Sequence, residues 1–201
     1  MKRFVPFIIA LILMVGASAY GHRPVQNPDP NHIHVDFAVW VNGKQLDFSD
    51  QKYMSEAYDP DSGQEVRVDP MRKFLHLHDG NSHIVHRHKP GLGFGEFLAS
   101  IGFTLTDTCL TTDDAKQFCT DSGETLQLFV NGTQVSPFVS NYVFHDNDQI
   151  LLTYGADTPE VQHELSLMTH DACLYSKTCP WRGAPPTENC IADPTVPCVA
   201  P

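Results

Sequence analysis

Hydrophobic and polar residues alternate along residues 32–41, HIHVDFAVWV. Successive side chains of a strand point to opposite faces, so this pattern predicts a strand with one apolar, buried face and one face rich in histidine. The dipeptide Asn42-Gly43 follows directly, and it is the strongest short-range signal for a two-residue hairpin turn. We therefore expect a hairpin whose second strand occupies residues 44–48.

The next patterns predict a second hairpin and a helix. After a polar excursion over residues 49–71, residues 73–89 contain two short apolar segments around an Asp-Gly-Asn turn. In residues 90–102 apolar side chains recur at helical spacing, and Gly102 is suited to end the helix. The apolar residues of this predicted helix are Leu92, Phe94, Phe97, Leu98 and Ile101.

The C-terminal half repeats these signals. Residues 107–125 read as an acidic loop, and residues 126–138 as a strand–turn–strand around a second Asn-Gly pair. A further strand or hairpin ends at Gly155. Residues 158–176 have the pattern of a helix, with Thr158 as its N-cap and a proline in its first turn.

The order of hairpin, hairpin, helix and further strands predicts an α+β fold. A small mixed β-sheet packed on one helix, as in the β-grasp fold, accommodates this order, and another α+β topology is the alternative. We expect a signal segment at 1–19, an extended leader at 20–31, a histidine-rich domain at 32–156, and a helix with a Cys- and Pro-rich tail at 157–201.

The N-terminal residues have the pattern of a secretory signal. Lys2 and Arg3 precede the apolar run FVPFIIALILMVG, and the small residues ASA stand before Tyr20. The run is shorter than the roughly 20 residues that span a bilayer, so an uncleaved membrane anchor is the second interpretation. We predict a secreted or periplasmic protein.

Charge narrows the choice of partners. The formal net charge is −11, and loss of the two basic residues of the signal changes it to −13. Such acidity disfavours nucleic acid, whose binding depends on Lys and Arg, and membrane contact is expected only through an uncleaved signal. Cations are the electrostatic suggestion that remains. Another exported protein, or a second copy of this chain, is a further candidate partner.

The cysteines predict disulfides. Six cysteines in an exported chain read as three bridges, and sequence alone does not choose among the fifteen pairings. Cys109 with Cys119 is the favoured single pairing, because the next cysteine lies far along the chain, and the four cysteines of the tail then pair among themselves. Those four are Cys173, Cys179, Cys190 and Cys198.

Six of the eleven histidines form three His-x-His pairs. The pairs are His32/His34, His76/His78 and His86/His88. In the second hairpin an odd number of loop residues places both of its pairs on one face, whereas an even number turns the last pair inward. We predict the odd count, because it avoids burying two imidazoles, although it points Arg87 inward.

Imidazoles at this spacing suit a metal ion. Neighbouring strands bring side chains within about 4.5–5.5 Å at Cβ, and imidazole nitrogens bind Zn or Cu at about 2.0–2.1 Å. All-imidazole donor sets favour Cu(II) or Zn(II). We expect the four histidines of the second hairpin as the first choice of ligands and the first pair next. Asp36, Asp79 and His83 are candidates to orient an imidazole from behind.

We therefore predict an exported module that holds or delivers Cu(II) or Zn(II) on the open face of a sheet. The alternatives are a metal-independent adhesion or assembly module with a pH-sensitive histidine face, and a zinc hydrolase or hydratase. A thiol–disulfide oxidoreductase is least favoured, because the chain has no Cys-x-x-Cys. An enzyme is the less favoured class overall.

Three stretches of the chain, HIHVDFAVWVNGKQLDF, HLHDG…VHRHKPG and ACLYSKTCP…GAPPTENC, together resemble a family of small exported archaeal and bacterial proteins. The resemblance runs from about His32 to Cys190. Some members of that family carry a protein-disulfide-isomerase label. The resemblance implies export and a Cys-rich C-terminal tail, and it implies no mechanism.

Overall fold

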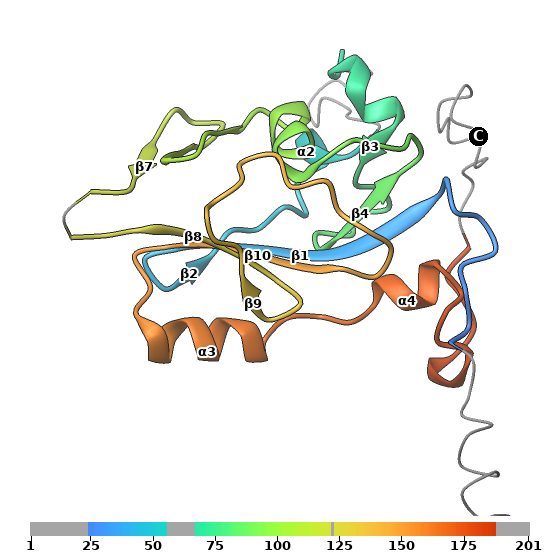
Figure 1. Ribbon diagram of the computed structural model, residues 1–201. Coiled ribbons are helices and arrows are strands. Elements are labelled where there is room, and N and C mark those ends of the chain that lie inside the picture. The colour runs from blue at the N-terminus through green and yellow to red at the C-terminus, as the bar shows by residue number, and fades with distance from the viewer. Residues whose placement is uncertain (1–23, 56–66, 122, 188–201) are drawn as a thin grey trace, which may run out of the picture.

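A computed structural model of the protein describes residues 24–55, 67–121 and 123–187 (Figure 1). The predicted signal segment, residues 56–66, and the last two cysteines, Cys190 and Cys198, lie outside the described residues. Among the described residues, no helix is both long and apolar enough to cross a membrane.

The fold is α+β, as predicted, and it is built on a seven-stranded mixed sheet. Its path runs β3-β4-β1-β10-β8-β9, and β2 pairs with β1 beside this path. The central strands β1 and β10 are parallel, whereas the other pairs are antiparallel. The strands are β1 (Ile33–Val41), β2 (Lys44–Gln45), β3 (Leu75–His76), β4 (Ile84–Arg87), β8 (Leu126–Val130), β9 (Thr133–Gln134) and β10 (Gln149–Tyr154). A β-grasp topology stays a prediction.

Both Asn-Gly pairs form the hairpin turns that the sequence predicts. Asn42 and Gly43 have φ values of 51° and 72° between β1 and β2, and Asn131 and Gly132 have 51° and 75° between β8 and β9. Positive φ at both central residues is the requirement of the turn type that matches strand twist. These turns set the register of their strands locally.

Helices cover both faces of the sheet, which corrects the expectation of one covered face. Helix α2 (Phe94–Ser100) lies on one side, and α3 (Thr158–Ser166) and α4 (Ala172–Tyr175) lie on the other (Figure 1). Every residue of β1 is accordingly buried, as expected for a central strand with elements packed on both faces. Short 3-10 helices span Gln51–Tyr53, Pro70–Lys73 and Pro180–Arg182.

Two apolar clusters follow from this arrangement. The larger joins the odd-numbered side chains of β1 to α2, where all five apolar residues of the predicted helix are buried. Gly102, with φ of 93°, follows the end of α2 as predicted. The smaller cluster joins Ala38 and Trp40 of β1 to Val161 of α3. His34 of β1 shares the face of this smaller cluster, farther toward the start of the strand.

The segment predicted as an acidic loop contains strands. A separate three-stranded sheet consists of β5 (Thr104–Leu105), β6 (Cys109–Thr111) and β7 (Gln117–Cys119). Cys109 faces Cys119 across β6 and β7, and the two form the predicted disulfide. Leu110 is fully buried there. The prediction gave too much weight to the acidic residues and too little to the few apolar ones between them.

The predicted helix over 158–176 is broken. Its first part begins after Asp157, whose carboxylate accepts the Glu160 N–H, so Asp157 rather than Thr158 is the N-cap. The chain leaves helical conformation after Ser166 and resumes it for one turn as α4. The second part is tied to the sheet, because the Asp36 carboxylate of β1 accepts the backbone N–H of Ala172 at 3.0 Å.

Candidate metal centre

The three strands β1, β4 and β3 place histidines in a row across the sheet. His86 pairs directly with His34 on one side and with His76 on the other. The pairing of His76 with His86 leaves an odd number of residues between them, so the predicted register of this hairpin is confirmed. A turn through Asp79 and Gly80, both with positive φ, joins the two strands.

All six histidines of the three pairs gather on one face, but that face is not open. His34, His76, His86 and His88 are at most 1% exposed, and His32 is 8% exposed. The expectation of an open face was wrong because it assumed that only the opposite face was covered. Part of the cover is α4, whose Tyr175 ring lies 5.5 Å from the His34 ring and 5.2 Å from the His86 ring between centroids.

Three of these side chains converge closely. His32, His34 and His86 each offer one ring nitrogen, and the three nitrogens lie within 4.8 Å of one another. The Nε2 atoms of His32 and His34 are 3.1 Å apart. Two nitrogens bound to one ion at about 2.0–2.1 Å lie about 3–3.5 Å apart. Small ring movements therefore suffice for this group to hold a metal ion.

The far side of two rings is held by acceptors. His34 Nδ1 lies 2.8 Å from Ser176 Oγ, and this hydroxyl donates in turn to Asp146 Oδ1. His76 Nδ1 donates to the carbonyl oxygen of Arg72 at 2.6 Å. A carbonyl accepts only from a protonated nitrogen, so His76 carries its proton on Nδ1. The hydroxyl that donates to Asp146 has the same effect on His34. Both rings then present Nε2 as the nitrogen that can bind a metal.

The remaining two histidines pack around this group. His78 Nδ1 donates to Asp79 Oδ2 at 2.6 Å, and its Nε2 lies 3.3 Å from His86 Nδ1. The His88 ring stacks between those of His32 and His76, with centroids 4.0 and 5.1 Å away. The cluster is thus continuous, although only three of its six members form the close group.

The three predicted orienting residues have different positions. Asp79 contacts an imidazole directly, as described above. Asp36 instead uses both carboxylate oxygens on the segment before α4, accepting from Thr169 Oγ1, Asp171 N and Ala172 N. His83 Nε2 lies 3.4 Å from Asp171 Oδ2. Asp36 and His83 therefore hold in place the helix that covers the histidines.

The residues of α4 that touch the cluster were not singled out in the sequence. Tyr175 and Ser176 lie inside the six-residue separation of the disulfide between Cys173 and Cys179. This pairing agrees with the prediction that the tail cysteines pair among themselves. The only signal for the role of this loop was its enclosure by two cysteines. Nothing in the local pattern distinguishes Ser176 or Asp146 from ordinary polar residues.

Arg87 supports β4 from the opposite face. It points inward as the register requires, and its guanidinium donates to the carbonyl of Phe144 at 2.7 Å. Burial lowers the pKa of Arg87 from its ordinary value, while the nearby charges of Asp146 and Asp148 oppose this change. The cost of an inward arginine is thus offset by a carbonyl and by two carboxylates.

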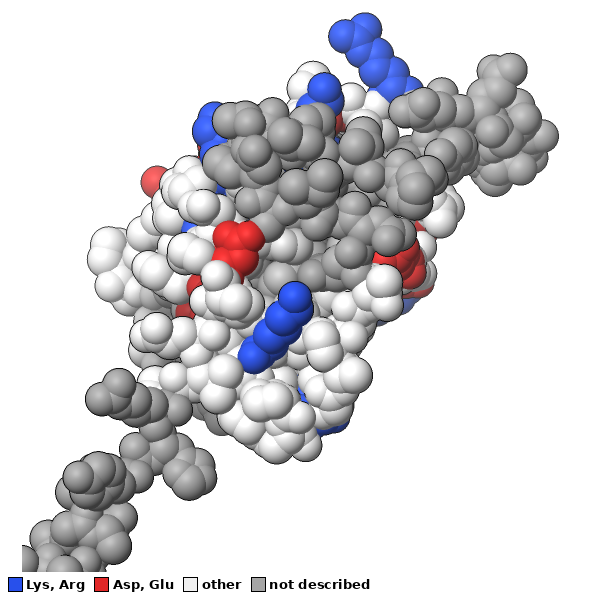
Figure 2. All heavy atoms as spheres, turned by 90° about the vertical axis from the view of Figure 1, so that its right-hand side faces the viewer, with Lys and Arg blue, Asp and Glu red and all other residues white. Residues whose placement is uncertain are grey.

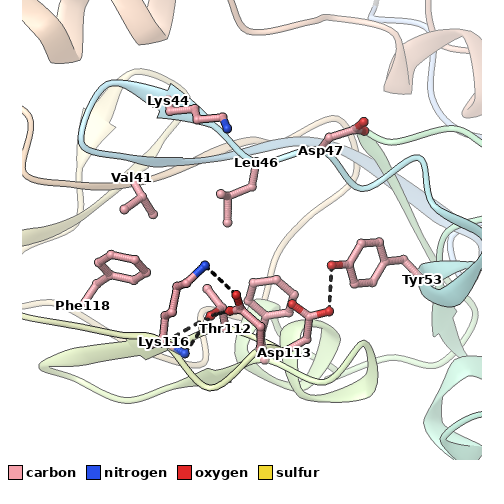
Figure 3. A pocket seen from close by; sticks show the side chains of 11 residues that line it. Val41, Lys44, Leu46, Asp47, Tyr53, Thr112, Asp113, Lys116 and Phe118 are labelled. Carbon is pink, nitrogen blue, oxygen red and sulfur yellow. Dashed lines mark hydrogen bonds and ion pairs between the residues drawn. The ribbon is translucent and has the colours of Figure 1, made fainter.

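A separate pocket of about 320 Å³ lies on the other side of the sheet. Val41, which shares the core face of β1, lines it together with charged residues of the turn between β6 and β7 (Figure 3). Lys116 pairs with Asp114 at 2.7 Å, and Tyr53 donates to Asp113 at 3.0 Å. The polar groups of this pocket thus largely satisfy one another.

On the face shown in Figure 2, the charged side chains of the described residues stand apart from one another.

Comparison of the chain with protein-family models, with curated proteins and with solved structures found no match. The functional argument therefore depends on the residues and their geometry.

Proposed function

We propose that this protein is an exported module that binds one first-row transition-metal ion, Cu(II) or Zn(II), between His32, His34 and His86, and holds it or delivers it to another protein. The observation that carries the proposal is the convergence of three buried imidazole nitrogens within 4.8 Å. One ion at this point can bind a ring nitrogen from each of the three side chains at once, because their spacing is close to that of ligands around a single metal ion.

The donor set favours these two metals. Imidazole suits Zn and Cu, and among divalent ions a nitrogen site binds Cu(II) most tightly. The Ser176–Asp146 pair behind His34 resembles the carboxylate support common behind ligating histidines. The strands that carry the ligands are central to the sheet, so the nitrogens are held by a rigid frame.

The location outside the cytoplasm is part of the proposal. The disulfides Cys109–Cys119 and Cys173–Cys179 indicate an oxidising environment. Secretion itself rests on the N-terminal pattern and on the family resemblance of the sequence. A thiol-exchange activity has no support in the described cysteines, because both bridges join residues farther apart than Cys-x-x-Cys.

Metal titration of the tag-free chain, purified from the extracytoplasmic fraction, tests the proposal. We expect Cu(II) and Zn(II) to bind more tightly than roughly 10 μM. His34→Ala should weaken the binding at least tenfold, because it removes a ligand from the centre of the close group. Competition with a chromophoric chelator measures both values.

His163→Ala is the matched control. His163 is an exposed histidine of α3 and lies outside the cluster, so its loss should leave the affinity unchanged. Circular dichroism of each variant establishes that it is folded. Binding weaker than roughly 10 μM by the folded wild-type chain would refute the proposal.

A further inference from the structure

A pocket on the face of the sheet opposite the histidines has the form of a small-molecule site (Figure 3). Its volume is about 320 Å³, which is at the small end of the roughly 300–1,000 Å³ of ligand pockets. Residues of β2, of the 3-10 helix Gln51–Tyr53 and of the turn between β6 and β7 contribute to its lining. None of the lining residues is a histidine, so the pocket is separate from the candidate metal centre.

The walls of the pocket carry aromatic rings that are firmly held. Phe103 and Tyr53 are only 3% and 6% exposed, and their rings lie 6.1 Å apart between centroids. Both rings also pack against Phe48 of the main core, at 5.5 and 5.4 Å. Phe118, at the end of the pocket opposite Tyr53 (Figure 3), lies 5.5 Å from the ring of Tyr154. Because other rings hold these walls in place, the pocket is formed before a ligand arrives.

The carboxylates of the turn between β6 and β7 already have partners. Asp113 accepts hydrogen bonds from Lys52 Nζ at 2.7 Å and from the Tyr53 hydroxyl at 3.0 Å. Asp114 forms an ion pair with Lys116 at 2.7 Å, and the hydrogen bond from Lys116 lowers the pKa of Asp114 to about 2. These four charges therefore compensate one another, and they leave the recognition of a charged ligand to other residues.

Two opposite charges on the facing wall are left for a ligand. Lys44 lines the pocket and forms no ion pair among the described residues. Asp47 accepts the backbone N–H of Ser49 at 2.9 Å, and this hydrogen bond lowers the pKa of Asp47, so its carboxylate is ionised at neutral pH. Leu46 stands between Lys44 and Asp47 on the same wall (Figure 3). A cation and an anion that flank an apolar side chain complement a zwitterion that carries an apolar group.

We propose that this pocket binds a free α-amino acid with an apolar, preferably aromatic, side chain. Lys44 meets the α-carboxylate and Asp47 meets the α-ammonium group, while the side chain of the ligand lies between Phe118 and Tyr53. Aromatic rings prefer tilted or offset contacts with one another, and the rings of the pocket offer both edges and faces. The proposal is independent of the metal centre, since it uses neither the histidines nor their face of the sheet.

The affinity should be modest, because both charges lie at the exposed rim. A solvent-exposed ion pair contributes up to about fivefold in affinity, so burial of the ligand side chain supplies most of the binding. We expect a dissociation constant of about 1 mM or tighter for L-phenylalanine. Glycine, which has the same charges and no side chain, should bind about tenfold more weakly or worse.

NMR titration of the full tag-free chain with matched probes tests the assignment. L-Phenylalanine carries both charges, phenylpropionate lacks the ammonium group, and phenethylamine lacks the carboxylate. Each of the incomplete probes should bind about three- to fivefold more weakly than phenylalanine. The amide signals that shift should belong to residues that line the pocket.

Variants of the two rim residues test their roles, and both residues are exposed, so neither change removes core packing. Lys44→Ala should weaken the binding of phenylalanine and phenylpropionate about three- to fivefold and leave that of phenethylamine unchanged. Asp47→Asn should weaken the binding of phenylalanine and phenethylamine by a similar factor and leave that of phenylpropionate unchanged. Lys73→Ala is the matched control, because this exposed lysine lies outside the pocket, and it should bind every probe as the wild type does.

The outcomes are separate from those for the metal centre. If phenylalanine binds no more tightly than glycine, the pocket is not an amino-acid site. Equal binding of phenylalanine and phenylpropionate, unchanged by Asp47→Asn, overturns the contact with the ammonium group and with it the assignment to amino acids. The expected order of probes and variants, measured on metal-free protein, supports the proposal whether or not the histidines bind an ion.

Discussion

The Ser176 hydroxyl connects His34 to Asp146, and its removal tests whether this connection prepares His34 for a metal ion. Ser176→Ala deletes the oxygen that lies 2.8 Å from His34 Nδ1 and that donates to Asp146 Oδ1. Because Ser176 is only 1% exposed, bulk water has little access to replace the lost group. The change leaves all six histidines in place.

Ser176→Ala should lower two quantities, the affinity for the metal ion and the stability of the metal-free chain. Loss of a group that supports a ligating histidine costs about 10–100-fold in metal affinity, which corresponds to about 1.4–2.8 kcal/mol. The stability of the metal-free chain should also fall, by about 1–3 kcal/mol, because this buried hydroxyl takes part in two hydrogen bonds that are both lost. Asp146 keeps two other donors, the backbone N–H of His34 and the side-chain amide of Asn147.

Two measurements on the same preparations separate these effects. Chelator competition measures the affinity for Cu(II) or Zn(II), and urea unfolding of the metal-free chain measures stability. Ser166→Ala is the control, because its hydroxyl also hydrogen-bonds a neighbour, the His163 carbonyl, but on an exposed turn of α3. If Ser176→Ala binds metal within twofold of the wild type while its stability falls as expected, the hydroxyl supports the fold and does not prepare His34.

Further expectations concern the disulfides and a buried carboxyl group. Replacing Cys173 and Cys179 by serine should weaken metal binding about tenfold, because the loop that covers the histidines loosens. Replacing Cys109 and Cys119 by serine should leave the metal affinity unchanged. Each double replacement should lower the free energy of unfolding by about 2–3 kcal/mol, because the two disulfides close loops of comparable length. Equal affinities in both double variants would contradict this role of the loop. Burial raises the pKa of Glu164 above its ordinary 4.5, so the native state holds this proton more tightly than the unfolded state. The resulting stability is complete below pH 4.5 and is lost as pH rises through the raised pKa, and urea unfolding across pH 4–7 should show a shallower decline in Glu164→Gln.

The short-range patterns predicted the elements that carry the site. Alternation of apolar and polar residues over 32–41 gave β1 and the common face of its histidines, because strand geometry has a period of two. The odd count in the second hairpin followed from the cost of burying His86 and His88, and the register is as predicted. Its premise failed, however, because both histidines are buried in the observed register as well.

Contacts between distant segments were beyond those patterns. The Asp36 carboxylate anchors the start of α4 by accepting from backbone N–H groups more than 130 residues away along the chain. Ser176 and Asp146 support His34 across similar distances along the chain. None of these pairs leaves a periodic signal, since each is one polar residue in an otherwise ordinary turn or helix.

The sequence by itself indicated which residues could bind a metal ion: three His-x-His pairs, with the two members of each pair on one side of an extended segment because side chains alternate there. The tertiary structure alone decided that the three pairs share one face and that this face is buried, that α4 covers it under a disulfide-closed loop, and that His32, His34 and His86 converge most closely. The physical reason is that side-chain direction is a local property of a strand. Burial and nitrogen spacing depend on which distant segment packs against it.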